Sequence, residues 1–115
     1  MKAYEQVAVD FAQALLDSRN EDAHAMLVSK LAEAFTPLAL GERFRRMWSG
    51  YSDEDARSLH FDEEFSLDDW RGKREMDVGW AYVGILGDEF VEAVSVVVCE
   101  SDGTLKIREV EWGRP

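Results

Sequence analysis

The sequence predicts an α+β fold in which two to three N-terminal helices pack on a curved, antiparallel, four-stranded sheet. Two observations predict it. Apolar residues recur at helical spacing up to about residue 48, and from about residue 58 they alternate with the period of a strand. Helices that precede a run of strands are typical of α+β domains. Residues 1–115 are expected to form one domain, because no linker or repeat divides them.

The helical half contains three start signals. A first helix is expected over about residues 3–18. A second, short helix is expected to follow Asn20 as its N-cap and to end near Ser29, with carboxylates in its first turn. A third is expected to begin at Thr36 as N-cap, with Pro37 at the first helical position, where a missing N–H costs nothing.

The second half alternates between strands and short connections. Charged residues and a glycine separate the first two strands, GDE joins the second to the third, and SDG predicts a hairpin turn before the last. The four strands are expected at residues 58–67, 76–86, 89–100 and 104–112.

The net charge of −11 is placed unevenly. Residues 1–50 carry six Lys/Arg against seven Asp/Glu, and residues 51–115 carry seven against seventeen. This balance argues against binding to nucleic acids or anionic membranes and favours a basic protein partner, although a merely solubilising surface is the alternative. The residues proposed for protein interaction are called the acidic belt: Asp53, Glu54, Asp55, Asp62, Glu64, Asp68 and Asp69.

No cofactor or metal site is expected. The single Cys99 lies in an apolar run typical of an inert core thiol, and His24 and His60 lack the spacing of metal ligands. His24 is expected to face solvent. The N-terminus does not read as a secretion signal, and no apolar run has the length of a membrane span, so a cytoplasmic location is expected.

Several core and cap positions together resemble the nuclear transport factor 2-like superfamily, in particular small bacterial domains of unknown function. The positions are Phe11, Ala23, Leu27, Leu31, Phe35, Thr36, Pro37, Leu40, Phe44, Trp48, Gly50 and the final GTLKIREVEW. The resemblance implies a cone-like roll of the cystatin type, with a bent sheet wrapped on the helices and a pocket inside. Some relatives are isomerases, cyclases or dehydratases with an Asp or His base, and others are binding, dimerisation or immunity-type proteins. No Asp–His signature matches here residue by residue.

Two carboxylates interrupt apolar rows of the expected strands. Glu63 follows Leu59 and Phe61, and Glu109 follows Ile107. Burying an unpaired carboxylate is costly, so such a group points to a partner, a pocket mouth or an irregular strand. One hypothesis is a ligand pocket in which both carboxylates face an aromatic wall. Its residues are Trp48, Glu63, Trp80, Tyr82 and Glu109. The alternative places the carboxylates at the rim, where a bulge changes which face they occupy.

The expected function is non-catalytic binding or protein interaction through a small apolar pocket and an acidic face. The alternative is an isomerase or hydratase with Glu63 or Glu109 as the general acid or base. The third strand is apolar on both faces, which predicts that both are covered and favours a homodimer through the sheet. A basic protein and a small apolar ligand are the other expected partners.

Overall fold

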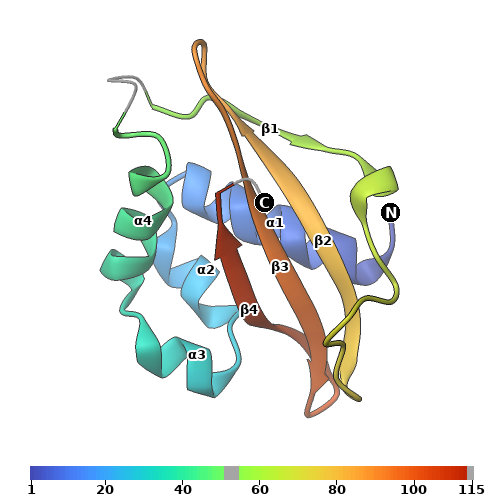
Figure 1. The fold of residues 1–115 in the computed structure, drawn as a ribbon. Coiled ribbons are helices and arrows are strands. Elements are labelled where there is room, and N and C mark those ends of the chain that lie inside the picture. The colour runs from blue at the N-terminus through green and yellow to red at the C-terminus, as the bar shows by residue number, and fades with distance from the viewer. Residues whose placement is uncertain (51–54, 114–115) are drawn as a thin grey trace.

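The computed structural model describes residues 1–50 and 55–113. In those ranges helices precede an antiparallel sheet, which confirms the predicted α+β class (Figure 1). The helices are α1 (Ala3–Leu16), α2 (Asn20–Ala25), α3 (Ser29–Ala34) and α4 (Pro37–Arg46). The strands are β1 (Ser58–Phe61), β2 (Asp77–Leu86), β3 (Val91–Ser101) and β4 (Thr104–Trp112), with a 3₁₀ turn η1 (Glu63–Phe65) after β1. Within these residues no helix is long and apolar enough to cross a membrane.

The sheet is a simple meander of order β1-β2-β3-β4. In Figure 1, α1 lies behind the strands, and α2, α3 and α4 stand beside β4. We call the face against α1 the inner face and the opposite one the outer face. Alternate residues of a strand point to opposite faces, so each strand contributes one row to the core.

The core lies between α1 and the inner face. Phe11 and Leu15 of α1 are buried there, because apolar residues at helical spacing form one stripe along the helix. The sheet contributes the row of β2 that contains Val83 and the row of β3 that contains Val96. Burial of each large apolar side chain contributes roughly 1.5–3 kcal/mol of stabilisation, so this stripe accounts for the docking of α1.

The helix boundaries show which capping signals were correct. Thr36 caps α4 as predicted, since its hydroxyl oxygen accepts a hydrogen bond of 3.1 Å from the Ala39 N–H. Asn20 is not a cap but the first residue of α2. The second helix ends earlier than predicted because the chain bonds to β4: Val28 donates to the Ile107 carbonyl, and Ile107 donates to the Met26 carbonyl, both at 2.8 Å. The helical residues that follow form a separate helix, α3.

The hairpin between β3 and β4 is confirmed at the SDG sequence. Asp102 and Gly103 have φ angles of 51° and 82°. Positive φ at both central residues is the geometry that matches the twist of paired strands, and Asp-Gly is a favoured pair for it.

The first strand is shorter than predicted. β1 ends at Phe61, and Asp62 then caps η1 by accepting a 2.9 Å hydrogen bond from the Glu64 N–H. The chain rejoins the sheet at Leu67, which exchanges two 2.9 Å backbone hydrogen bonds with Trp80. The interruption of the apolar row at Glu63 is therefore an interruption of the strand itself.

A bulge explains the second interruption. Val97 faces Glu109 while Val98 faces Ile107, so β4 has one extra residue, Arg108, at this point. The inner row of β4 continues through Val110, not Glu109, and Glu109 lies on the outer face. The irregular-strand alternative is correct for both carboxylates.

Gly79 is expected to be intolerant of a side chain. A Cβ built there overlaps the ring of Tyr4, which is buried and held by a 3.2 Å hydrogen bond from its hydroxyl to Asp68. We expect Gly79→Ala to lower the free energy of unfolding by about 1–3 kcal/mol, the usual cost of overpacking. Denaturant titration measures this. Gly50→Ala is the control, because nothing lies within 4 Å of its added Cβ; equal stability of the two variants would contradict the expectation.

Candidate functional site on the outer face of the sheet

The outer face carries a repeated arrangement of side chains across three strands. At successive levels an aromatic residue of β2 lies beside a small residue of β3, which lies beside a glutamate of β4. The two levels are Tyr82, Ser95, Glu111 and Trp80, Val97, Glu109. These residues, except Tyr82, line a hollow of about 190 Å³ together with Val110. We call this hollow, with Tyr82 beside it, the outer trough.

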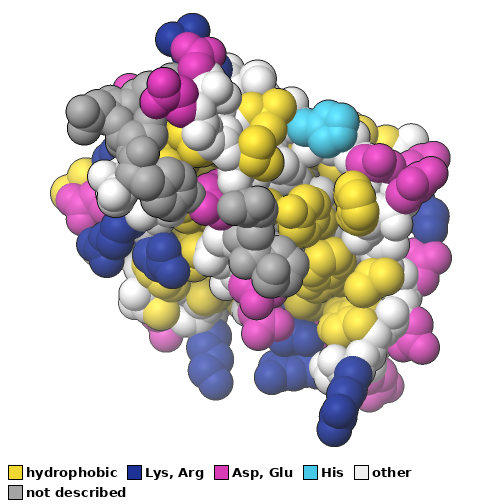
Figure 2. Space-filling model, turned by 45° about the horizontal axis from the view of Figure 1, so that its top comes forward, with side chains coloured by type: hydrophobic (Ala, Val, Ile, Leu, Met, Phe, Trp, Pro, Cys, Tyr) yellow, Lys and Arg dark blue, Asp and Glu magenta, His cyan; other side chains and the backbone are white. Residues whose placement is uncertain are grey.

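The aromatic wall of the outer trough extends beyond β2. The ring of Tyr82 lies 6.2 Å from that of Trp80 and 5.6 Å from that of Phe65, measured between centroids. Phe65 is 54% exposed, although it is large and apolar. In Figure 2, hydrophobic side chains gather to the right of the grey residues, with a histidine above them, acidic side chains to the right and basic side chains below. A patch of this kind with a polar border is typical of an interaction surface.

Polar contacts to α1 hold the segment that carries Phe65. The buried carboxylate of Glu5 accepts hydrogen bonds from the Ser66 hydroxyl at 2.6 Å and from the Lys2 backbone N–H at 2.7 Å. Burial alone would raise the pKa of Glu5, but these two hydrogen bonds and the positive charges of Lys2 and the N-terminus together hold the pKa below its ordinary value. Asp68 accepts from the Lys2 ammonium at 2.9 Å. The segment is thus fixed against the N-terminal end of α1.

A buried ion pair closes one end of the outer face. Arg108 donates two hydrogen bonds of 2.6 Å to the two oxygens of Asp77, which also accepts from the Arg74 backbone N–H at 2.8 Å. The hydrogen bonds from Arg108 are the main reason why the pKa of Asp77 is lowered, and they outweigh the opposing effect of burial. Trp80, Arg108 and Glu109 also line a second hollow of about 280 Å³ that adjoins the trough.

The predicted ligand pocket is not formed as one site. Trp80, Tyr82 and Glu109 do meet on the outer face, but Trp48 packs on the inner side of the sheet. Trp48 is 4% exposed, stacks on Phe90 with ring centroids 5.1 Å apart, and belongs to the core. This placement corrects the expectation of a common aromatic wall, since the two tryptophans lie on opposite faces of the sheet.

The predicted carboxylates are not buried. Glu63 is exposed on η1. The Glu109 side chain is 63% exposed, and its nearest cation is the Arg108 guanidinium at 3.7 Å. The expectation of a buried acid or base in a closed pocket is therefore wrong for both residues. Neither needs an internal partner, because water solvates them.

The acidic belt is only partly available to a partner. Asp53 and Glu54 lie outside the described residues. Asp62 caps η1, and Asp68 bonds to Lys2 and Tyr4. The remaining belt residues are exposed: Asp55, Glu64 and Asp69.

The histidines and the cysteine do not converge. No group of three metal-binding side chains occurs within residues 1–50 and 55–113. His24 does not face solvent freely, because its Nε2 bonds to the carbonyls of Ala32 and Phe35 at 2.9 and 2.8 Å and so fastens α2 to α3. Burial raises the pKa of the Cys99 thiol, which keeps it protonated and unreactive.

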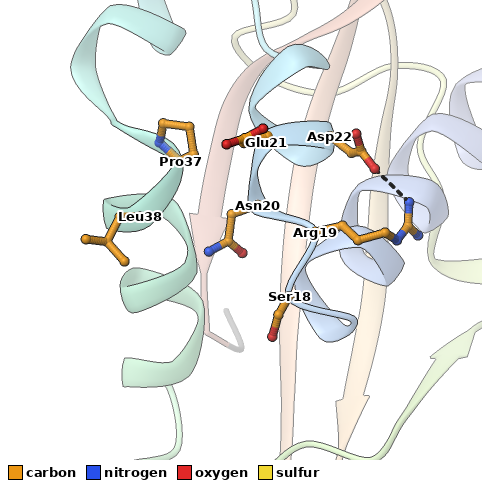
Figure 3. A pocket seen from close by; sticks show the side chains of 7 residues that line it. All are labelled: Ser18, Arg19, Asn20, Glu21, Asp22, Pro37 and Leu38. Carbon is orange, nitrogen blue, oxygen red and sulfur yellow. Dashed lines mark hydrogen bonds and ion pairs between the residues drawn. The ribbon is translucent and has the colours of Figure 1, made fainter.

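A larger hollow lies elsewhere, where the turn before α2 meets the start of α4. It measures about 470 Å³, and Figure 3 shows the side chains that line it: Ser18, Arg19, Asn20, Glu21, Asp22, Pro37 and Leu38. Two of its three charged side chains pair with each other, since Arg19 lies 3.1 Å from Asp22. Its lining is mostly polar, and the Asn20 Oδ1 there is a buried oxygen with no hydrogen-bond partner among the described residues. The hollow lacks aromatic residues, so the outer trough is the stronger candidate.

Comparisons of the chain with protein-family models, curated proteins and solved structures find no match. The site is therefore assigned from geometry alone. Sequence reasoning missed Ser95 and Glu111 as site residues and the pairing of Asp77 with Arg108. The alternation of apolar and polar residues shows which residues of β3 and β4 share a face with Ser95 or Glu111. It does not show which strand positions lie side by side, and only the register and the bulge bring these two residues close to Trp80.

Proposed function

We propose that this chain is a non-catalytic binding domain and that the outer face of the sheet is its binding surface. The observation that carries the proposal is the aromatic wall formed by exposed Phe65 and half-buried Trp80 and Tyr82 beside the glutamates of β4. Aromatic residues at the centre of a surface patch contribute large contact areas and are enriched at energetically important positions of interfaces. A protein partner fits this open surface better than a small apolar ligand, which needs a more enclosed cavity.

A homodimer through the sheet is the second candidate. Exposed apolar residues at the margins of the outer face, including Leu67 and Val91, favour it. Two other facts oppose it. Ser95 and Val97 are already buried within one chain, so the central row does not require a second copy, and the charge of −11 disfavours close approach of two copies.

The alternative of an isomerase or hydratase has less support. Glu63 and Glu109 are both exposed and lie in different environments, one on η1 and one on β4. Acid–base catalysis by a carboxylate at neutral pH usually relies on burial or on charged neighbours that raise its pKa.

Membership in the nuclear transport factor 2-like superfamily remains a proposal, supported by the order of helices before a sheet meander. A cytoplasmic location is proposed in the same way, and the single buried Cys99 is compatible with a reducing compartment.

The proposal is tested with a double variant, Trp80→Ala with Tyr82→Ala. Both side chains are only partly buried, so we expect the fold to survive, which circular dichroism checks. The protein is immobilised, and extracts of its source cells are passed over it. We expect partners retained by the wild type to be lost by the double variant and kept by Leu38→Ala, an exposed apolar control on α4. Identical retention by all three proteins would contradict the proposed surface.

Sedimentation equilibrium of the purified wild type tests the homodimer separately. A monomer over the whole accessible concentration range excludes that candidate. If the wild type is a dimer and the double variant is a monomer, the partner that binds the outer face is a second copy of this chain.

A further inference from the structure

The outer trough contains a buried hydroxyl without a partner. Ser95 is 1% exposed, and its Oγ forms no hydrogen bond to any residue that the structure describes. Its side chain lies on the outer face, between Tyr82 and Glu111 of the neighbouring strands, at the floor of the trough. A buried polar group left unsatisfied costs roughly 1–3 kcal/mol, so a water molecule or a polar group of a partner is expected beside it.

The two glutamates of β4, Glu109 and Glu111, accept no hydrogen bond from a cation among the described residues. Arg108, the cation nearest to Glu109, is already bound by two short hydrogen bonds to Asp77, and its 3.7 Å separation from Glu109 exceeds a hydrogen bond. Glu111 takes part in no ion pair within the described part of the chain, and it is exposed. Two carboxylates two residues apart on one strand therefore face the trough, while Arg71, Arg74 and Arg108 line the adjoining hollow.

The opposite wall supplies an aromatic face. Trp80 is the best of the aromatic side chains for attracting a cation, and it lines the same hollow as the two glutamates. An ammonium or guanidinium group placed between them contacts the indole and two carboxylates, above the buried Ser95 at the floor. A carboxylate or phosphate placed there faces the negative charge of both glutamates.

We propose that the outer trough binds the cationic side chain of a lysine or arginine from a basic segment of a partner protein. This inference rests on the proposed function and adds the chemistry of the partner. The net charge of −11 attracts such a segment over longer distances. The hollow of about 190 Å³ holds one side chain, and the exposed Phe65 beside it offers contact to apolar residues of the same segment.

The probe is a short, acetylated and amidated peptide of alternating leucine and lysine. Two matched peptides replace each lysine with neutral Nε-acetyl-lysine or with glutamate. Binding to the ¹⁵N-labelled protein is followed by NMR at the indole N–H of Trp80, assigned with Trp80→Phe, and at the backbone amides of Glu109 and Glu111. We expect the lysine peptide to shift these signals, and the glutamate peptide to leave them unchanged.

Two pairs of substitutions that change the net charge by the same amount then test the position of the site. In Glu109→Gln with Glu111→Gln we expect about fivefold weaker binding of the lysine peptide, the effect of losing two partly exposed ion pairs. Glu33→Gln with Glu42→Gln, at exposed positions of α3 and α4, changes the net charge equally and should retain wild-type affinity. Equal loss in both pairs of variants would show general attraction and overturn the inference.

The two proposals fail in different ways. If the acetyl-lysine peptide shifts the signals of Trp80, Glu109 and Glu111 as strongly as the lysine peptide does, the outer face binds but the cation site is wrong. If none of the three peptides shifts these signals, the cation site is overturned, while the retention experiment with Trp80→Ala and Tyr82→Ala still decides the proposed function.

Discussion

Replacement of Arg108 by methionine is expected to lower the free energy of unfolding by about 3 kcal/mol. The side chain of Asp77 is 1% exposed and that of Arg108 is 14% exposed, so the change leaves a carboxylate that is cut off from water. Breaking a buried pair from one side costs roughly 3–5 kcal/mol. We place the expected value at the lower end, because Arg108 keeps some contact with water. Denaturant titration measures the change.

The control removes both charges. In Asp77→Asn with Arg108→Met no buried charge is left, so the double variant is expected to lose less stability than Arg108→Met alone. If the free energy of unfolding of Arg108→Met lies within about 1 kcal/mol of the wild-type value, the loss is as small as for an exposed ion pair, and the pair must be solvated. That outcome would contradict the description of this end of the outer face.

The pH dependence of the same pair has a definite sign. Because the pKa of Asp77 is lowered in the folded protein, its charged form stabilises the fold above the unfolded pKa of about 4. This contribution is lost as the pH falls through the lowered pKa of the folded state. The unpaired, buried Asp77 of Arg108→Met has a raised pKa, so the stability difference between the wild type and this variant should be largest near neutral pH and shrink as the pH falls toward and below about 4.

Replacement of Trp48 by alanine is expected to be the other strongly destabilising change, with a loss of about 3–5 kcal/mol. Trp48 stacks on Phe90 and meets Phe44 edge-to-face at a centroid distance of 5.1 Å, so truncation removes contacts on several sides and leaves a cavity. Thermal or denaturant unfolding measures the loss.

Trp80→Ala is the matched control, since it removes the same atoms from the opposite face. Trp80 is only half-buried and lies outside the core, and we expect a loss of about 1 kcal/mol. Binding should respond in the reverse order, with Trp80→Ala the more damaging. Equal destabilisation by the two changes would mean that the outer face is part of the core.

The periodicity of the sequence predicted the fold class and most of the elements. Helix α4 was predicted from the Thr36 and Pro37 pair, and β4 was predicted with its observed limits, because both depend on local signals. The prediction of Asn20 as an N-cap was wrong for a physical reason. An asparagine favours both caps and turns, and the neighbouring Gly41 leaves room for its side chain against α4 instead.

The site was predicted in part. The row of β2 with Trp80 and Tyr82 was recognisable as aromatic, and Glu109 was correctly singled out as unusual. Its position on the outer face depends on a bulge at Arg108, which is set by pairing with β3 and has no local signal. Trp48 was wrongly predicted to share a pocket with Trp80 and Tyr82, because sequence spacing does not reveal which side of the sheet a helix covers.

The central claim is that the outer face of the sheet binds a partner, and site-specific photo-crosslinking tests it most directly. A photoreactive phenylalanine analogue is placed at Tyr82 or, as control, at Leu38, and each protein is irradiated in its source cells. We expect a covalent adduct of defined mass from position 82 and little from position 38, with the mass distinguishing a second copy from another protein. Absence of an adduct from position 82, or equal adducts from both positions, would contradict the account.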